Sequence, residues 1–222
     1  MHATELLQPV LIYALPVLFA ITVHEAAHGY AARYFGDPTA AMLGRITLNP
    51  IKHIHPIGTI LMPLLLYFST SGAFLFGYAK PVPVNFGRLR NPKRDMIWGA
   101  LAGPASNFLQ AILWAIALVF LVTSNTQERF FLEMARAGVM VNLVMWAFNL
   151  FPLLPLDGGR ILAGLLPTKA AITFSRIEPY GFFIVLALVV FGIVGTIWLS
   201  PLMDIGYSVI NWMITPLVAL LR

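Results

Sequence analysis

The sequence predicts an all-α polytopic membrane protein. Hydrophobic residues make up 59% of the 222 residues and charged residues only 10%, whereas a soluble domain is about 25% charged. The apolar residues gather in segments close to the ~20 residues that a helix needs to cross a bilayer. These observations predict one membrane-embedded domain over residues 1–222, with no room for a sizeable soluble domain.

Five segments are long and apolar enough to be membrane-spanning helices, and the first three of them are expected to form the core: 8–32, 96–122, 133–153, 180–199 and 204–221. Segment 57–76 is ambiguous because it contains Gly58, Pro63 and the polar residues 69–71. It either spans the membrane or folds back as a re-entrant segment. The sequence therefore predicts five to six transmembrane helices.

The connections between these segments carry a weaker pattern. Residues 42–50 are expected to form a short strand or a membrane-associated β-hairpin. Residues 80–85 are expected to be an extended segment that could lie only at the edge of a sheet, because Pro81 and Pro83 lack the N–H group that pairing on both sides requires.

The basic residues predict the orientation, because Lys and Arg gather in cytoplasmic loops. With 57–76 re-entrant and the N-terminus external, only Arg129 and Arg136 of the 14 basic residues lie outside. If 57–76 spans the membrane, this asymmetry disappears. We therefore favour the re-entrant arrangement in the cell (inner) membrane, with an external N-terminus and a cytoplasmic C-terminus.

Composition also limits the chemistry. The absence of Cys excludes disulfides, thiolate ligands and a Cys nucleophile, so a bound metal must take His, Asp or Glu. The net charge of +5 fits cytoplasmic loops, and no motif for binding nucleic acid occurs. The N-terminus lacks the basic region of a signal peptide, so the first helix is expected to be retained.

The motif His24-Glu25-Ala26-Ala27-His28 ends the first apolar segment. On a helix, residues i and i+4 lie on one face, so two imidazoles can bind one Zn²⁺ while the intervening Glu acts as a base. Ionisable side chains in a membrane segment are costly and indicate function. The alternative is a pair of helix-end histidines that bond to carbonyl groups.

A catalytic zinc site needs a third protein ligand and an open position. Asp157 is the candidate, since it follows an apolar helix that Pro152 and Pro155 break and precedes Gly158-Gly159, which permit a tight backbone. The alternative is an Asp that only caps the following helix.

Three motifs in this order resemble the site-2 protease family of intramembrane zinc metalloproteases (peptidase family M50): H-E-x-x-H, A-G-P-x-x-N at residues 102–107, and N-x-x-P…L-D-G at residues 149–158. The resemblance covers about residues 15–165. Residues 77–85, GYAKPVPVN, resemble the compact bacterial branch without a PDZ domain.

The resemblance implies His24, His28 and Asp157 as zinc ligands and Glu25 as the catalytic base. It further implies an active site within the membrane near the cytoplasmic side. The expected substrates are transmembrane segments of single-pass membrane proteins, cleaved by regulated intramembrane proteolysis in contact with the lipid bilayer. The sequence does not indicate the oligomeric state.

Four further residues are candidates for supporting roles. Asn149 and Asn107 face inward on core helices and are expected to contact the oxyanion or position the substrate, with interhelical hydrogen bonding as the alternative. His55 stands where the compact branch usually carries Asp. His53 or His55 is either an interfacial histidine or a temporary zinc ligand of a resting state.

The sequence leaves two other functions open. A membrane zinc transporter also places His and Asp in the membrane, but it would have no use for Glu25 between the ligands. A catalytically inactive relative could bind membrane segments as an adaptor, although all four expected catalytic residues are present.

Overall fold

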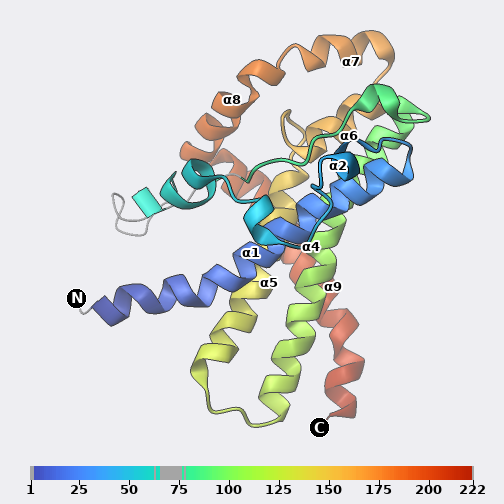
Figure 1. Ribbon diagram of the computed structural model, residues 1–222. Coiled ribbons are helices and arrows are strands. Elements are labelled where there is room, and N and C mark those ends of the chain that lie inside the picture. Colours follow the sequence, from blue (N-terminus) through green and yellow to red (C-terminus); the bar gives the residue numbers. More distant parts are fainter. Residues whose placement is uncertain (1–2, 63, 66–76, 78, 222) are drawn as a thin grey trace.

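The computed structural model describes residues 3–62, 64–65, 77 and 79–221, and these form a helical protein (Figure 1). The α-helices are α1 (Ala3–Tyr34), α2 (Thr39–Met42), α4 (Pro92–Thr123), α5 (Arg129–Asn149), α6 (Asp157–Leu165), α7 (Thr168–Ser175), α8 (Glu178–Val190) and α9 (Ser200–Leu220). Short 3₁₀-helices form η1 (Pro50–Lys52) and η3 (Phe86–Arg88). Wider π-helices form η2 (Pro56–Leu61) and η4 (Val194–Leu199).

Four helical stretches are long and apolar enough to cross a membrane: Gln8–Tyr34, Pro92–Thr123, Arg129–Asn149 and Val194–Leu220. The count rises to five if α7 and α8, which are bent by 67°, form one broken span. In the stretch Val194–Leu220, only 11% of the 18-residue window used to judge its hydropathy is buried inside the protein. An outer surface this apolar suits a lipid environment, so the prediction of a multi-pass membrane protein is confirmed.

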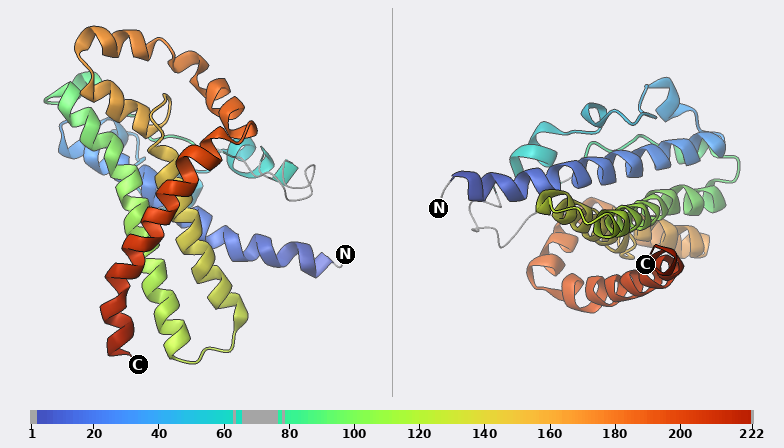
Figure 2. Two further views of the ribbon diagram at one scale, coloured as in Figure 1. Left: turned by 180° about the vertical axis from the view of Figure 1, so that it is seen from behind. Right: turned by 90° about the horizontal axis from the view of Figure 1, so that it is seen from below.

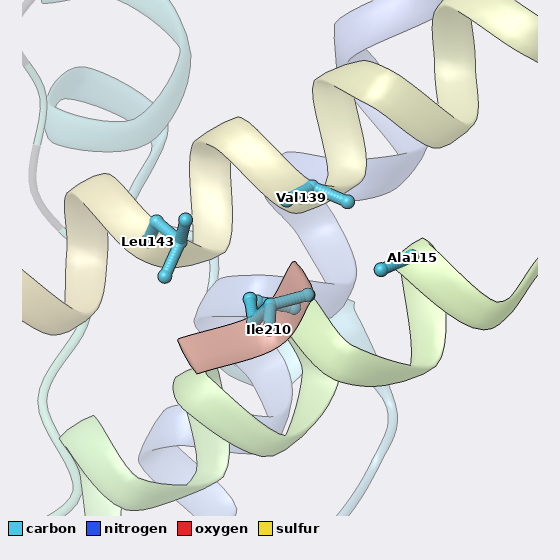
Figure 3. Close-up of a cluster of buried hydrophobic side chains, with 5 residues drawn as sticks. Ala115, Val139, Leu143 and Ile210 are labelled. Atoms are coloured by element: carbon cyan, nitrogen blue, oxygen red, sulfur yellow. The ribbon is translucent and has the colours of Figure 1, made fainter. Parts of the chain in front are cut away.

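The helices pack in layers around α1 (Figure 2). The view from below shows the segment from α2 to η2 on one side of α1 and the α4–α5 pair on the other, with α9 beyond that pair. Between α4, α5 and α9 lies the apolar core, in which Ala115, Val139, Leu143 and Ile210 converge (Figure 3). This packing holds α1 against α4, where the functional site forms.

The β-hairpin predicted for residues 42–50 is wrong. Among the described residues there is no strand: this segment leaves α2 through a turn at Gly44, with φ +61°, and enters η1 at Pro50. Residues 80–85 are non-helical, as expected, but they pair with no strand. The Arg45 guanidinium donates to the carbonyl oxygens of Lys80 and Pro81 and so takes the place of a backbone ladder.

The ambiguous segment 57–76 falls largely outside the described residues, so its re-entrant or spanning form stays a prediction. Its beginning is helical: His55 accepts a hydrogen bond from the Gly58 N–H at Nδ1, 3.1 Å away, and caps η2. Pro56 opens η2, where its missing N–H costs no helical hydrogen bond.

The last two predicted spans, 180–199 and 204–221, have different boundaries in the structure. The chain breaks earlier, at Gly192 with φ +74°, and then runs through η4 directly into α9. Pro201 fits near the start of α9 because the wide π-turns of η4 precede it. The helix α8 alone is therefore too short to span a bilayer.

The direction of α9 differs from the predicted topology. Trp198, which precedes α9, donates from Nε1 to the Ala147 carbonyl near the end of α5, at 2.8 Å. Tyr207, further along α9, shares a cavity with Glu133 and Arg136 near the start of α5. The two helices are thus antiparallel. The C-terminal end of α9 lies at the same end as the α4–α5 connection (Figure 1), although the pattern of basic residues predicted opposite sides of the membrane for these two.

Candidate metal centre

Two histidines of α1 form one side of the site. His24 and His28 lie one turn apart, with ring centroids 4.6 Å apart and planes nearly perpendicular. Their Nε2 atoms are 3.0 Å apart. The predicted helical spacing of the motif therefore does bring both imidazoles to one point.

Asp157 reaches the same point from the first residue of α6. Its Oδ2 lies 3.3 Å from Nε2 of His24 and 3.3 Å from Nε2 of His28. The following glycines allow this approach: a Cβ at Gly158 would lie 2.1 Å from the Leu150 carbonyl oxygen, and one at Gly159 would lie 2.3 Å from the Leu154 nitrogen. Only glycine lets the chain fold back this closely before α6.

A chain of hydrogen bonds behind His24 fixes its ring. His24 Nδ1 lies 2.6 Å from Asn107 Oδ1. The Asn107 amide nitrogen in turn donates to the Ala20 carbonyl at 3.1 Å and to Asn142 Oδ1 at 3.0 Å, and Asn142 donates to the Gly138 carbonyl at 2.9 Å. Because both amide donors of Asn107 are used, its oxygen must face His24, and His24 must carry its proton on Nδ1.

His28 is oriented in the same way by the backbone. Its Nδ1 lies 2.8 Å from the Gly99 carbonyl, which can only accept. In its neutral form each ring therefore carries its proton on Nδ1 and directs a bare Nε2 lone pair at the other ring and at Asp157. The buried Oδ2 of Asp157 has no hydrogen-bond donor among the described residues either.

Three acceptors that face one another without a proton, those of His24 and Asp157 buried and that of His28 half-buried, favour a cation between them. Tetrahedral zinc with bonds of about 2.0–2.1 Å to imidazole nitrogen separates its ligand atoms by roughly 3.3 Å, close to the distances among these three atoms. They are also the one group of three or more His, Asp or Glu side chains among the described residues that converges in this way. The residues present thus fit a zinc ion.

Gly103 on α4 closes the other side of the histidine pair. A Cβ at this position would lie 2.4 Å from His28 Nε2 and 2.6 Å from His24 Cε1. Helix α4 can therefore contact the imidazoles only through a glycine here, which gives a physical reason for the A-G-P-x-x-N motif.

Glu25 lies beside the cluster and borders two cavities. One, of about 230 Å³, also contains polar groups such as Asp95 and Arg160. The other, of about 590 Å³, is lined mainly by apolar residues that include Met145 and Phe148. Glu25 is thus reachable from a polar side and from an apolar side.

The predicted supporting residues divide into two groups. Asn149 lines both cavities together with Glu25, and its amide donates to the Met145 carbonyl at 2.9 Å, which leaves a second N–H. Asn107 is fully buried and has no free N–H. The expected contact of Asn107 with the oxyanion or substrate is therefore replaced by a role behind His24.

His53 and His55 do not join the metal cluster. His53 is fully buried, and its Nε2 lies 2.9 Å from the Thr47 carbonyl. His55 caps η2. This arrangement does not support the hypothesis that either histidine is a resting-state zinc ligand.

One contact at the site was missed in the sequence. The backbone N–H of Val82 donates to Glu25 Oε2 at 2.7 Å. The two residues are 57 positions apart, so no local spacing could indicate the contact. The two flanking prolines, Pro81 and Pro83, were a signal, since they leave Val82 as the only N–H donor among the three residues.

Comparisons with known proteins match this chain to a peptidase family and to proteins named as zinc metalloproteases. The sequence model described as "Peptidase family M50" matches residues 124–192, which include Asn149 and Asp157. "Putative zinc metalloprotease YwhC" of Bacillus subtilis (strain 168) is 38% identical over 209 residues, which is 90% of this chain and 88% of that protein.

More distant relatives carry the same kind of name. "Putative zinc metalloprotease Rip2" of Mycolicibacterium smegmatis is 27% identical over 78% of this chain and 64% of that protein. The Rip2 protein of Mycobacterium tuberculosis (strain ATCC 25618 / H37Rv) is 28% identical over 73% of this chain and 54% of that protein. This chain thus spans under two thirds of the Rip2 length. No solved structure matches the chain.

Proposed function

Because the chain belongs to peptidase family M50 and its relatives are named as zinc metalloproteases, we propose that this metalloprotease is an intramembrane endopeptidase of the site-2 type. It hydrolyses peptide bonds in the transmembrane segments of single-pass membrane proteins. One observation carries the proposal: His24, Glu25 and His28 lie on α1, a helix that is apolar and long enough to cross a membrane, and Asp157 meets the two histidines from the first residue of α6.

Each side chain has a distinct task in this proposal. His24, His28 and Asp157 would hold a zinc ion, which when bound would supply Lewis-acid polarisation of the scissile carbonyl and would lower the pKa of a water molecule. Glu25 takes a proton from the attacking water and delivers it to the leaving amine. Asn149 lines both cavities, and its second N–H donates to the oxygen that develops negative charge.

The two cavities suit the two reactants. Water needs a polar path, and the smaller cavity provides one with Asp95 and Arg160. A substrate side chain from the membrane is apolar, and the larger cavity is lined mainly by apolar residues. The scissile peptide must also leave its helix, because the carbonyl groups of a helix are already hydrogen-bonded.

We place the protein in the cell (inner) membrane. The N-terminal end of α1, near Pro9 and Tyr13, lies at the end of the bundle that holds Glu133 and Arg136. We assign this end to the external side and the metal site to the cytoplasmic side, where most basic residues lie. The antiparallel packing of α9 on α5 then puts the end of α9 outside as well, in place of the cytoplasmic C-terminus expected from the sequence.

The test uses the full chain in liposomes with a model single-pass substrate. Mass spectrometry of the products locates the cut, and a zinc-sensitive dye inside the vesicles reports transport. The proposal predicts a cut within the membrane segment and no dye response. Cuts confined to the soluble flanks would contradict intramembrane cleavage, and zinc flux without cleavage would favour a transporter.

A further inference from the structure

Residues Lys80–Asn85, which we call the strap, run across α1 at the active site. The Val82 side chain is buried, and a Cβ at Gly29 of α1 would lie 3.3 Å from Val82 Cγ1. At this close approach the Val82 N–H donates to Glu25 Oε2 at 2.7 Å. The strap therefore contacts the base itself and not only its surroundings.

The strap is held on both sides of this contact. On one side, the Lys80 N–H donates to the His53 carbonyl at 2.9 Å, and Arg45 donates to the Lys80 and Pro81 carbonyls at 2.9 and 3.3 Å. On the other side, the Asn85 N–H donates to Asp37 Oδ2 at 2.6 Å. These hydrogen bonds hold the strap in place at both of its ends.

The sequence of the strap leaves one choice of donor. Pro81 and Pro83 have no N–H and hold φ near −65°. Val82 is therefore the only N–H in the Pro-Val-Pro triplet, and it points at a carboxylate, for which such bonds are short and strong. A rigid segment with a single donor fixes the orientation of the Glu25 carboxylate without offering competing hydrogen bonds.

We propose that the strap is a positioning element for the catalytic base, with the Val82 N–H as the group that orients Glu25. The inference rests on the proposed protease activity. A strap that instead covers Glu25 and must leave before catalysis would make the opposite prediction, because loss of the bond would then increase the rate.

Val82→Pro removes this N–H and retains a strap made of prolines. The matched variant Val84→Pro removes an N–H that bonds to none of the described residues, two positions further along the same segment. We expect Val82→Pro to lower kcat about 10- to 100-fold with little change in KM, since misplacement of a reacting group by about 1 Å has effects of this size. Zinc content should equal that of the wild type.

Two results would overturn the proposal: a kcat for Val82→Pro equal to that of Val84→Pro, or one above that of the wild type. Val82→Ala keeps the N–H and shows what the buried side chain contributes. Its kcat should stay well above that of Val82→Pro.

A second measurement needs neither activity nor the Val82→Pro variant. Hydrogen exchange of the Val82 amide in ¹⁵N-valine-labelled protein should be at least about 10-fold faster in Glu25→Ala than in the wild type. Glu25→Gln retains an acceptor oxygen and should retain slow exchange. Equal exchange rates in all three proteins would contradict the contact. If the wild type cleaves no substrate, the proposed function fails, and this exchange experiment alone decides on the strap.

Discussion

The Nδ1 atom of His24 lies 2.6 Å from Oδ1 of Asn107, at the end of a hydrogen-bonded chain that begins on α5. The chain dictates which nitrogen of the imidazole is bare. In this way α4 and α5, which supply neither histidine, determine the chemistry of the H-E-x-x-H motif on α1.

Asn107→Ala should weaken zinc binding about 10- to 100-fold, because groups that orient a metal ligand have effects of this size. Competition with a chelator measures the affinity. Gln110→Ala is the control, since Gln110 is a buried amide on the same helix that bonds neither histidine. Equal affinities for the two variants would mean that Asn107 does not orient His24.

Gly103→Ala should abolish stoichiometric zinc binding, because the added methyl group collides with both imidazoles. Gly99→Ala lies one turn away, where an added Cβ meets nothing within 4 Å, and it should retain the metal. The zinc content of the purified variants, together with their thermal unfolding midpoints, checks this prediction. A full zinc content in Gly103→Ala would show that the helices are farther apart than described.

Stability should depend on pH through Asp37. Burial acts to raise the pKa of Asp37, but hydrogen bonds from the Thr39 hydroxyl and from the backbone N–H groups of Asn85 and Thr39 outweigh it and hold the pKa below its usual value. A carboxyl group with a lowered folded-state pKa stabilises the protein above the unfolded-state pKa, and this stabilisation is lost as the pH falls through the folded-state pKa.

Asp37→Asn should therefore unfold at a lower temperature than the wild type near pH 7, and the difference should shrink as the pH falls below about 4. Thermal unfolding in detergent over this pH range measures the effect. Glu128→Gln changes an exposed acid and is the control. A constant difference between Asp37→Asn and the wild type at all pH values would contradict the assignment.

The N-terminal end of α1 and the C-terminal end of α9 should lie on the same side of the membrane as residues 124–128, and residues 86–91 on the opposite side. Cysteine introduced singly at these places, in a chain that has none of its own, can be labelled by a reagent that does not cross the membrane. Labelling of a cysteine at Leu221 together with the 86–91 loop would restore the cytoplasmic C-terminus predicted from the sequence.

The sequence predicted those parts of the site that depend on residues close to one another in the chain. The spacing of His24 and His28 determined their common face on a helix, and the apolar segments identified the helices around them. Asp157 and Asn107 were found through motifs, but their distances from His24 depend on how three helices pack. For Asn107 the sequence left two roles open, substrate contact and interhelical hydrogen bonding, because a buried amide can serve either; its hydrogen bonds to Ala20 and Asn142 follow the second.

The errors have physical causes as well. Residues 42–50 have the composition of a hairpin, but Arg45 bonds the carbonyl groups that a second strand would have used. Gly192 resembles any glycine in an apolar run, and only its positive φ reveals the break before α9. Pro201 lies in the gap between the last two predicted spans, but the π-turns of η4 accommodate it within one helical stretch.

Zinc content and cleavage of a transmembrane substrate, compared between the wild type and Glu25→Gln, test the central claim most directly. The side-chain amide introduced by Glu25→Gln cannot accept the proton of the attacking water, while His24, His28 and Asp157 are unchanged. We predict one zinc per chain in both proteins and cleavage in the wild type alone. Equal cleavage by Glu25→Gln, or a wild type that binds no zinc, would contradict the account.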